Sequence, residues 1–181
     1  MKRIQYRHGV VAAAVVLIGL IASVAHCDRI GSNRPLPPIA IHFSPRGGCT
    51  EAVVDEIERA ATSIQVQAYS FTSAPIAKAL VEAHQRGVQV GVILDESQET
   101  EKYSSGDFLL HAGIPTLVDG RHAIAHNKVM ILDGNTVITG SFNFTKAAEE
   151  KNAENLLIIR SKELAKPYLE NWQRHREHSA G

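Results

Sequence analysis

The stretch from residue 126 to residue 145, HNKVMILDGNTVITGSFNFT, carries four polar side chains at the two ends of a mostly apolar run. It opens with His126 and Lys128 and closes with Ser141 and Asn143. An imidazole can act as a nucleophile or as a general acid or base. Ammonium, hydroxyl and amide groups can hold developing negative charge. The four side chains would therefore suit chemistry on an anionic group, provided that the fold brings them together.

Two short strands joined by a tight turn would bring these side chains together. Residues 129–132 and 137–138 are apolar at every position, which is typical of strands that helices cover on both faces. Asp133 and Gly134 between them are a strong hairpin signal, because glycine tolerates a positive φ and aspartate caps its own turn. Alternate residues of a strand share a face. The hairpin therefore returns the polar residues of its second strand to the end at which the first strand begins.

Strands that alternate with helices along the rest of the chain predict an α/β layer structure. The 181 residues and the hydrophobic content of 44% are enough for one domain with a real core. Two of the expected helices begin with Thr50 and Ser73, which we interpret as their N-caps. Besides the hairpin, we expect strands at 39–43, 63–71, 88–94, 114–118 and 154–160, and helices at 50–61, 73–87, 106–112 and 161–178.

The charge balance argues against a surface that is basic overall. The chain has 19 basic and 19 acidic side chains, and Lys2, Arg3 and Arg7 are the charged residues of its first 25 positions. Without them, 16 basic and 19 acidic side chains remain, for a net charge of −3. The global basic footprint of many nucleic-acid-binding proteins is therefore missing. Any phosphate binding must come from local charge.

Residues 1–25 have the pattern of a secretory signal peptide. Basic residues come first, residues 10–24 are apolar with few interruptions, and small residues precede a cleavage site that we place after Ala25. An uncleaved anchor is the alternative, because the apolar run is about as long as the shortest membrane spans. A lipoprotein cut before Cys27 is a weaker alternative, because the residue before it, His26, is bulky. Each reading predicts a periplasmic, secreted or membrane-anchored domain.

Residues 26–38 are rich in proline, glycine and asparagine, and we interpret them as a linker to a domain at 39–178. The two cysteines, Cys27 and Cys49, stand in no CxxC or histidine-rich setting, so they predict no metal site. They could pair in an oxidising compartment or remain two separate thiols. The sequence leaves both possibilities open.

The pattern HxKxxxxD at 126–133, followed by GSxN at 140–143, resembles the signature of the phospholipase D superfamily. The longer run that ends in KNAEN, together with QAYSFTSAPIAKALVEAHQRGV upstream, is similar to the small single-motif bacterial endonucleases of the Nuc type. The likeness covers essentially the whole predicted domain. It implies the phospholipase D-like fold, in which helices flank both faces of a mixed parallel and antiparallel sheet, with one HKD motif in this chain.

The resemblance also implies roles for single residues. His126 is similar to the nucleophile of the superfamily, and Lys128, Ser141 and Asn143 fall where the groups that bind phosphate lie. Glu154 falls where the superfamily has a carboxylate that orients the histidine. Relatives with two motifs carry both in one long chain. A chain with one motif is therefore expected to form a homodimer whose two motifs meet at the interface.

Asp133 completes the motif and belongs, with His126, Lys128 and Glu154, to the catalytic set that the resemblance suggests. Its position in the hairpin argues for a different task. It lies an odd number of residues after His126 and at the turn, so it should face away from the pocket. We expect it to hold the turn together.

These features predict a metal-independent endonuclease of low sequence specificity that works through a phosphohistidine intermediate. Paired lysines would replace a divalent metal, because no cluster of carboxylates is visible, and no cofactor is expected. A phospholipase D or cardiolipin-hydrolase type lipid phosphodiesterase is the main alternative, and a non-catalytic phosphate- or DNA-binding module is a third. Most of the other histidines, among them His122, His175 and His178, are interpreted as surface residues.

Overall fold

The computed structural model describes residues 35–101 and 104–180. The predicted signal peptide at 1–25, most of the predicted linker and Cys27 lie outside the described residues. Cys49 is buried and free, and its burial, with the nearby negative charge of Glu149, raises the pKa of its thiol to about 11. None of the helices in the two described ranges is long and apolar enough to cross a membrane.

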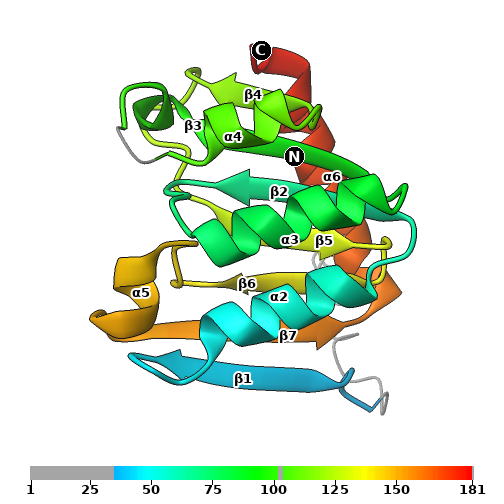
Figure 1. Ribbon diagram of the computed structural model, residues 1–181. Helices are drawn as coiled ribbons and strands as arrows, with labels where there is room; N and C mark the ends of the chain where they lie inside the picture. The colour runs from blue at the N-terminus through cyan, green and yellow to red at the C-terminus, as the bar shows by residue number, and fades with distance from the viewer. Residues whose placement is uncertain (1–34, 102–103, 181) are drawn as a thin grey trace, which may run out of the picture. The chain divides into compact units, whose positions relative to one another are not determined.

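A seven-stranded sheet lies at the centre of the described part, with the spatial order β1-β7-β6-β5-β2-β3-β4 (Figure 1). The pairs β2–β3 and β3–β4 are parallel, and the other pairs are antiparallel. The predicted α/β fold with a mixed sheet is therefore confirmed. The strands are β1 (Ile39–Ser44), β2 (Ser63–Ala68), β3 (Gln89–Asp95), β4 (Thr116–Asp119), β5 (Lys128–Leu132), β6 (Thr136–Gly140) and β7 (Glu154–Arg160).

Helices cover both faces of the sheet. In Figure 1, α2, α3 and α4 lie in front of it and α6 lies behind it. A short helix, α5, follows β6, and a 3-10 helix, η1, follows β3; the sequence analysis predicted neither of them. The helices are α2 (Cys49–Arg59), α3 (Ala74–Gln85), η1 (Glu96–Glu99), α4 (Gly106–His111), α5 (Lys146–Glu150) and α6 (Lys162–His178).

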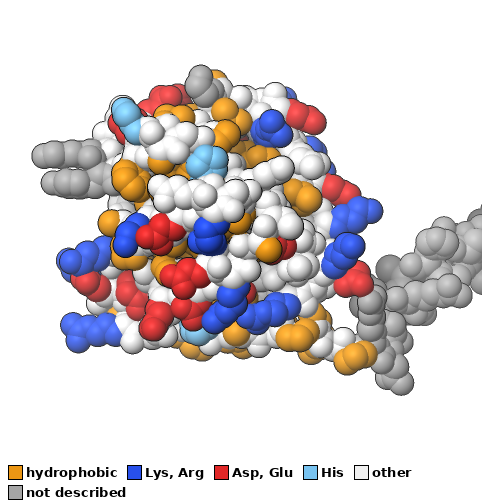
Figure 2. Space-filling model, turned by 45° about the vertical axis from the view of Figure 1, so that its right-hand side comes forward, with side chains coloured by type: hydrophobic (Ala, Val, Ile, Leu, Met, Phe, Trp, Pro, Cys, Tyr) orange, Lys and Arg blue, Asp and Glu red, His pale blue; other side chains and the backbone are white. Residues whose placement is uncertain are grey.

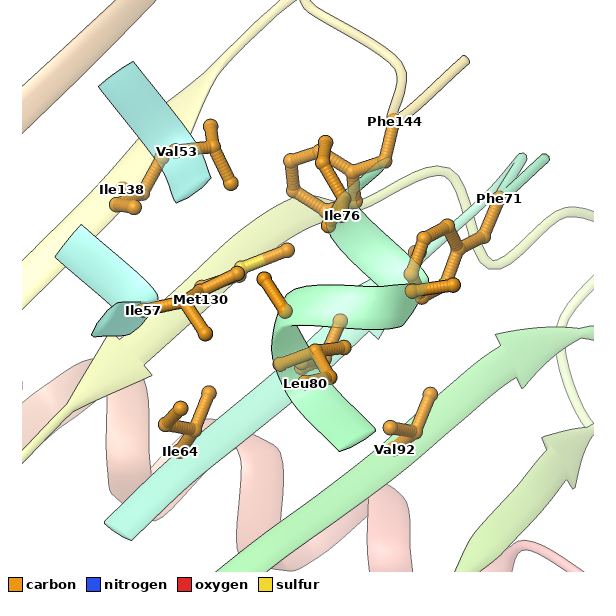
Figure 3. Packing of buried hydrophobic residues seen from close by; sticks show 14 of the residues in the cluster. Val53, Ile57, Ile64, Phe71, Ile76, Leu80, Val92, Met130, Ile138 and Phe144 are labelled. Atoms are coloured by element: carbon orange, nitrogen blue, oxygen red, sulfur yellow. The ribbon is translucent and has the colours of Figure 1, made fainter. Parts of the chain in front are cut away.

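Each face of the sheet packs its own layer of apolar side chains. The larger core lies under α2 and α3, where Met130 of β5 packs among helix residues (Figure 3). Phe71 and Phe144 meet edge to face in this core, with ring centroids 6.0 Å apart. Behind the sheet, Trp172 of α6 packs on the strands, and its Nε1 donates a hydrogen bond to Val66 O at 2.9 Å. Both faces of β5 and β6 are thus buried, as their apolar sequence predicts.

The helix boundaries show where local sequence signals failed. The prediction that Thr50 caps α2 is wrong, because the N-cap is Gly48 and Thr50 lies inside the helix. The carboxylate of Glu149 takes over the capping and accepts hydrogen bonds from Gly48 N at 3.1 Å and Thr50 N at 2.7 Å. Ser73 does stand at the N-cap position of α3, although its side chain makes no capping bond. The helix ends as predicted before Gly87, whose φ of 94° suits glycine.

The hairpin between β5 and β6 turns at Asp133 and Gly134, whose φ values of 50° and 60° match a type I′ turn. The Asp133 carboxylate accepts hydrogen bonds from the backbone N–H groups of Ala61, Thr62 and Ser63. The hydroxyl of Thr62 is a fourth donor, at 2.8 Å. Asp133 therefore fastens the hairpin turn to the segment that enters β2.

We expect Asp133→Ala to lower the free energy of unfolding by about 2 kcal/mol, because several donors lose an ionised acceptor. Burial alone would raise the pKa of Asp133, but the hydrogen bonds from residues 61–63 outweigh it and hold that pKa below its usual range. A lowered pKa stabilises the fold above the ordinary aspartate range and loses this effect as the pH falls through it. Urea unfolding at pH 7 and pH 3 should therefore show a gap between wild type and variant that shrinks in acid.

Asp133→Asn is the control for the turn itself, because asparagine also tolerates a positive φ. It should lose part of the stability while keeping the hairpin. A gap that is the same at both pH values would show that the charge of Asp133 does not stabilise the fold.

Candidate active site

The strand ends on the left-hand side of the sheet in Figure 1 lie close together, although they are far apart in the sequence. This row of strand ends, rather than an outer strand, is called the edge below. The antiparallel pairing of β5, β6 and β7 places the starts of β5 and β7 beside the end of β6. Strands β2 and β3 also end at this edge, because β2 runs antiparallel to β5 and parallel to β3. Residues that enter or leave these strands are therefore neighbours.

His126 and Lys128 lie together against Tyr69, the residue that follows β2. The rings of His126 and Tyr69 have centroids 4.5 Å apart and planes inclined by 54°. Lys128 Nζ lies 4.9 Å from the centroid of the same tyrosine ring and donates a hydrogen bond to His126 O at 2.8 Å. His126 is exposed, whereas Lys128 is only 7% exposed. The edge thus offers an accessible imidazole with an ammonium group directly beneath it.

The environment of Lys128 is poor in water and rich in negative charge. Burial lowers the pKa of Lys128, and the carboxylates of Glu154 and Asp95 raise it, with a net lowering. The face of the Tyr69 ring adds a further favourable contact for the cation. Because charges interact more strongly where water is excluded, this ammonium is well placed to attract a phosphate oxygen.

The GSxN segment crosses very close to the start of β7. Gly140 has a φ of 146°, and a Cβ at this position would lie 2.3 Å from Asn155 O. Glycine is therefore required here, because any side chain would collide with backbone. The next two N–H groups, of Ser141 and Phe142, both donate to the same oxygen, at 3.1 and 3.2 Å. These contacts fix the segment relative to β7.

Alternation places Ser141 and Asn143 on the opposite side from the core, because Phe142 and Phe144 are fully buried. Ser141 Oγ accepts hydrogen bonds from Asn155 N at 3.1 Å and Asn155 Nδ2 at 3.3 Å, which leaves its own proton to donate. The Oδ1 atom of Asn143 is buried and has no hydrogen-bond partner, which is unusual. A half-turn of this amide presents its NH₂ group instead, so Asn143 can also serve an anion as a donor.

Glu154 is the first residue of β7 and lies close enough to act on the charge of Lys128. Its Oε1 accepts a hydrogen bond from Asn152 Nδ2 at 3.1 Å. Among the residues that the structure describes, no hydrogen bond joins Glu154 to His126. The role that the resemblance implies, orientation of the histidine by Glu154, therefore stays a prediction.

The structure adds two residues to those that the sequence analysis named, Tyr69 and Asp95. The carboxylate of Asp95, at the end of β3, accepts hydrogen bonds from Ser97 N, Ser97 Oγ and Ala125 N. The Ala125 contact, at 2.6 Å, holds the residue directly before His126. The signal for Asp95 was an acidic residue directly after a buried strand, at the edge where parallel strands end together.

Asp133 does not join this group. It stands at the far end of β5, where residues 61–63 occupy its carboxylate. Of the catalytic set suggested by the motif, the structure thus brings His126 and Lys128 into contact, places Glu154 within electrostatic reach of Lys128, and puts Asp133 at the turn.

On the face in Figure 2, basic and acidic side chains alternate over short distances.

Within the described ranges, one group of three or more potential metal ligands occurs: Asp119, His122, His175 and His178. The sequence analysis predicted no metal site and missed this cluster, although the i, i+3 spacing of His175 and His178 on a helix was visible. The cluster includes none of the residues around His126.

A family profile described as "Cardiolipin synthase, PLD-like domain" matches residues 53–176. The match contains all the residues of the edge described above. The chain therefore belongs to the phospholipase D superfamily, as its single motif predicted.

Individual relatives agree with this assignment. A protein named phospholipase D from Rickettsia felis is 48% identical over 130 residues, which are 72% of this chain and 65% of the relative. The chain thus spans less than two thirds of the length of that relative. A mitochondrial cardiolipin hydrolase from Xenopus tropicalis is 33% identical over 116 residues, 64% of this chain and 55% of that protein.

The fold also matches a solved structure, nearly all of which aligns with this chain. The crystal structure of the phospholipase D family member Nuc from Salmonella typhimurium aligns with a TM-score of 0.76 and 43% identity. The alignment covers 79% of this chain and 96% of that chain. The predicted similarity to Nuc and the phospholipase D-like fold are therefore confirmed.

We expect Lys128→Met to raise the free energy of unfolding by about 1 kcal/mol near neutral pH, because it removes a buried charge and keeps the side-chain volume. The lowered pKa of Lys128 means that the unfolded chain binds more protons, so wild-type stability rises as the pH passes through that pKa. The advantage of the variant should therefore shrink in alkali. Urea unfolding at several pH values measures both effects.

Lys146→Met is the matched control, because the Lys146 side chain is 79% exposed. It should change the stability by less than about 0.5 kcal/mol. If Lys128→Met were strongly destabilising, Lys128 would be a structural residue rather than a functional charge held against the stability of the fold.

Proposed function

We propose that the protein is a phosphodiesterase that cleaves nucleic-acid phosphodiester bonds without a metal ion, with little sequence preference, as an exported homodimer. The single observation that carries this proposal is the pairing of an exposed imidazole, His126, with the buried ammonium group of Lys128. Phosphoryl transfer needs a nucleophile and a positive charge held at the phosphate. This edge of the sheet supplies both from the start of β5 and the residues directly before it.

The reaction runs in two steps. A ring nitrogen of His126 attacks phosphorus, the bond from phosphorus to the leaving oxygen breaks, and a second histidine protonates that oxygen. The same second histidine then removes a proton from water, whose oxygen displaces His126 and releases the phosphate product. Lys128, Ser141 and Asn143 stabilise the phosphoryl oxygens in both steps, in the manner of an oxyanion hole. Glu154 favours the imidazolium form of the histidine when it arises.

The second histidine comes from a second copy of the chain. The motif supplies one histidine and one lysine, while the two-step displacement needs a nucleophile and a separate acid. A two-fold axis through this edge would place His126 of the partner subunit opposite the first. It would also double the local positive charge on a domain whose mean charge is acidic, which suits a substrate with a charged backbone.

Nucleic acid is the favoured substrate because the sequence resembles the single-motif endonucleases of the Nuc type, and the structure of Nuc from Salmonella typhimurium aligns with this chain over 96% of its own length. A lipid phosphodiester is the second candidate. The name of the Rickettsia felis relative, phospholipase D, and that of the Xenopus tropicalis relative, a cardiolipin hydrolase, support it. Both substrates present the same phosphodiester to His126 and Lys128, so the site chemistry is common to them.

We expect His126→Ala to reduce turnover by at least about 10³-fold, because it removes the nucleophile. The variant should keep its fold and its oligomeric state, since His126 is exposed. The assay incubates purified protein with plasmid DNA, RNA and phospholipid vesicles, with circular dichroism and size-exclusion chromatography as checks. His111→Ala, an exposed histidine on α4, is the control. Near-normal rates for His126→Ala would place the nucleophile elsewhere, and cleavage of vesicles alone would favour the lipid reaction.

We expect the initial rate of cleavage to survive EDTA, because lysines and hydrogen-bond donors hold the phosphate. The measurement compares initial rates on plasmid DNA with and without the chelator. A rate that disappears in EDTA and returns with Mg²⁺ would refute the substitution of lysine for metal.

The dimer can be tested by mixing subunits. Folded His126→Ala chains are titrated into wild type under conditions of subunit exchange, and the rate per total protein is followed. Because each site would need both histidines, activity should fall with the square of the wild-type fraction. A linear fall, or full activity in an isolated monomer, would show that one subunit suffices.

A further inference from the structure

Three histidines surround one buried carboxylate beside β4, which is the outer strand on the opposite side of the sheet from β1. The last turn of α6 contributes two of these histidines. Asp119, the last residue of β4, is fully buried. His175 Nδ1 lies 2.6 Å from Asp119 Oδ2, and His122 Nδ1 lies 3.1 Å from both carboxylate oxygens. His178 Nε2 lies 3.3 Å from Asp119 Oδ1. One possible ligand atom from each of the four residues falls within 4.8 Å of all the others.

The spacing of the three imidazoles is nearly that of an equilateral triangle. Their ring centroids are 4.9 Å apart for His122 and His175, and 5.3 Å apart for the other two pairs. Imidazoles bound to one tetrahedral Zn²⁺ through bonds of about 2.0–2.1 Å have ring centres roughly 5 Å apart. Three rings at this spacing around a carboxylate are what a metal centre requires.

Hydrogen bonding alone does not account for the whole cluster. His178 Nε2 is buried and has no hydrogen-bond partner, although a carboxylate oxygen is close by. The two atoms are 3.3 Å apart, yet their geometry is not that of a hydrogen bond. A cation between them could take both atoms as ligands.

The charges closest to the cluster on the strands are negative, while Arg121 and Arg174 line the hollow beside it. Asp119 pairs in register with Asp95 on β3, so two buried carboxylates lie on neighbouring strands. This polar hollow of about 670 Å³, lined by His122, His175 and His178 among others, gives an ion access from solvent.

We propose that Asp119, His122, His175 and His178 form a binding site for one Zn²⁺ ion per chain. Imidazole and carboxylate ligands in a four-coordinate arrangement suit zinc, whereas Mg²⁺ and Ca²⁺ prefer oxygen ligands alone. Four protein ligands leave no position open for water or substrate, so the ion is structural rather than catalytic. The proposal is independent of the reaction at His126 and of its substrate.

The ion would act on the segment that carries His126. His122 lies four residues before His126, in the segment that joins β4 to β5. Asp95 already holds Ala125 N, and Tyr69 N donates to Asn127 O at 2.8 Å. Zinc at His122 would add a third anchor and join it to the C-terminal helix.

The test begins with purified protein freed of metal by a chelator. Zn²⁺ is then titrated in competition with a chromophoric chelator, and Co²⁺ is used as a spectroscopic probe. We expect one Zn²⁺ per chain, a rise in melting temperature on binding, and the intense visible absorption of tetrahedral Co²⁺. His122→Ala should weaken Zn²⁺ binding by at least about 100-fold, since loss of an outer-shell partner alone costs about 10–100-fold.

His122 is the best position for the variant, because its side chain is 45% exposed and its loss should leave the fold intact. His111→Ala, at an exposed histidine outside the cluster, should bind Zn²⁺ like wild type. A second measurement on wild type needs no variant: bound Zn²⁺ should protect His122, His175 and His178 from diethyl pyrocarbonate. Absence of Zn²⁺ binding, or binding that depends on His126 instead of His122, would overturn the proposal.

Chelation also separates this site from the catalytic one. Metal-free protein should melt at a lower temperature yet keep its initial rate below that temperature, and His122→Ala should reproduce both results. Loss of rate in EDTA that His122→Ala does not reproduce would instead place a metal at the phosphate site. That outcome would refute the proposed metal-free reaction and leave the zinc site standing.

Discussion

The arrangement of the active site depends on one buried charge, the ammonium group of Lys128, which its neighbours have to stabilise. Lys128 occupies the first position of β5, whose other residues pack into the two cores. Its ammonium is tolerable there because a tyrosine face, a backbone carbonyl and the negative charges of Glu154 and Asp95 surround it. Two strands must therefore bring carboxylates to this point, and a third must end just before Tyr69. A phosphate would complete the set of partners from the open side.

The topology of the sheet brings the neighbours of Lys128 together. An antiparallel run of β5, β6 and β7 returns the chain to the same edge twice, and the close passage of Gly140 over Asn155 fixes the return. Parallel β2 and β3 end at that edge as well, which adds Tyr69 and Asp95. Packing on both faces holds the strands in register, because a slip of one residue would turn Phe142 and Phe144 out of the core. The packing of apolar side chains in the two cores therefore fixes the positions of the polar side chains at this edge.

Local patterns in the sequence sufficed for the hairpin, its turn, most element boundaries and the shared side of Ser141 and Asn143. These features depend on residues a few positions apart, and alternation within strands fixes them. The partners that were missed are distant in the chain. The carboxylate that caps α2 comes from Glu149, about 100 residues away, and the partner of Asp119 in α6 is His175, 56 residues away. Such pairs follow from the order of strands in the sheet, which spacing alone does not reveal.

Hydrogen bonds constrain the segment from Gly120 to Asn127 at several points. Arg121 N donates to Asp119, Ala125 N donates to Asp95, and Asn127 O accepts from Tyr69 N. Most connections between strands tolerate changes of length, since their middles touch nothing. Here an added or deleted residue would pull on β3, β4 and β2 at once and would move the imidazole of His126 off its tyrosine. The length of the connection before β5 is therefore tied to the position of His126, even where individual side chains are free to change.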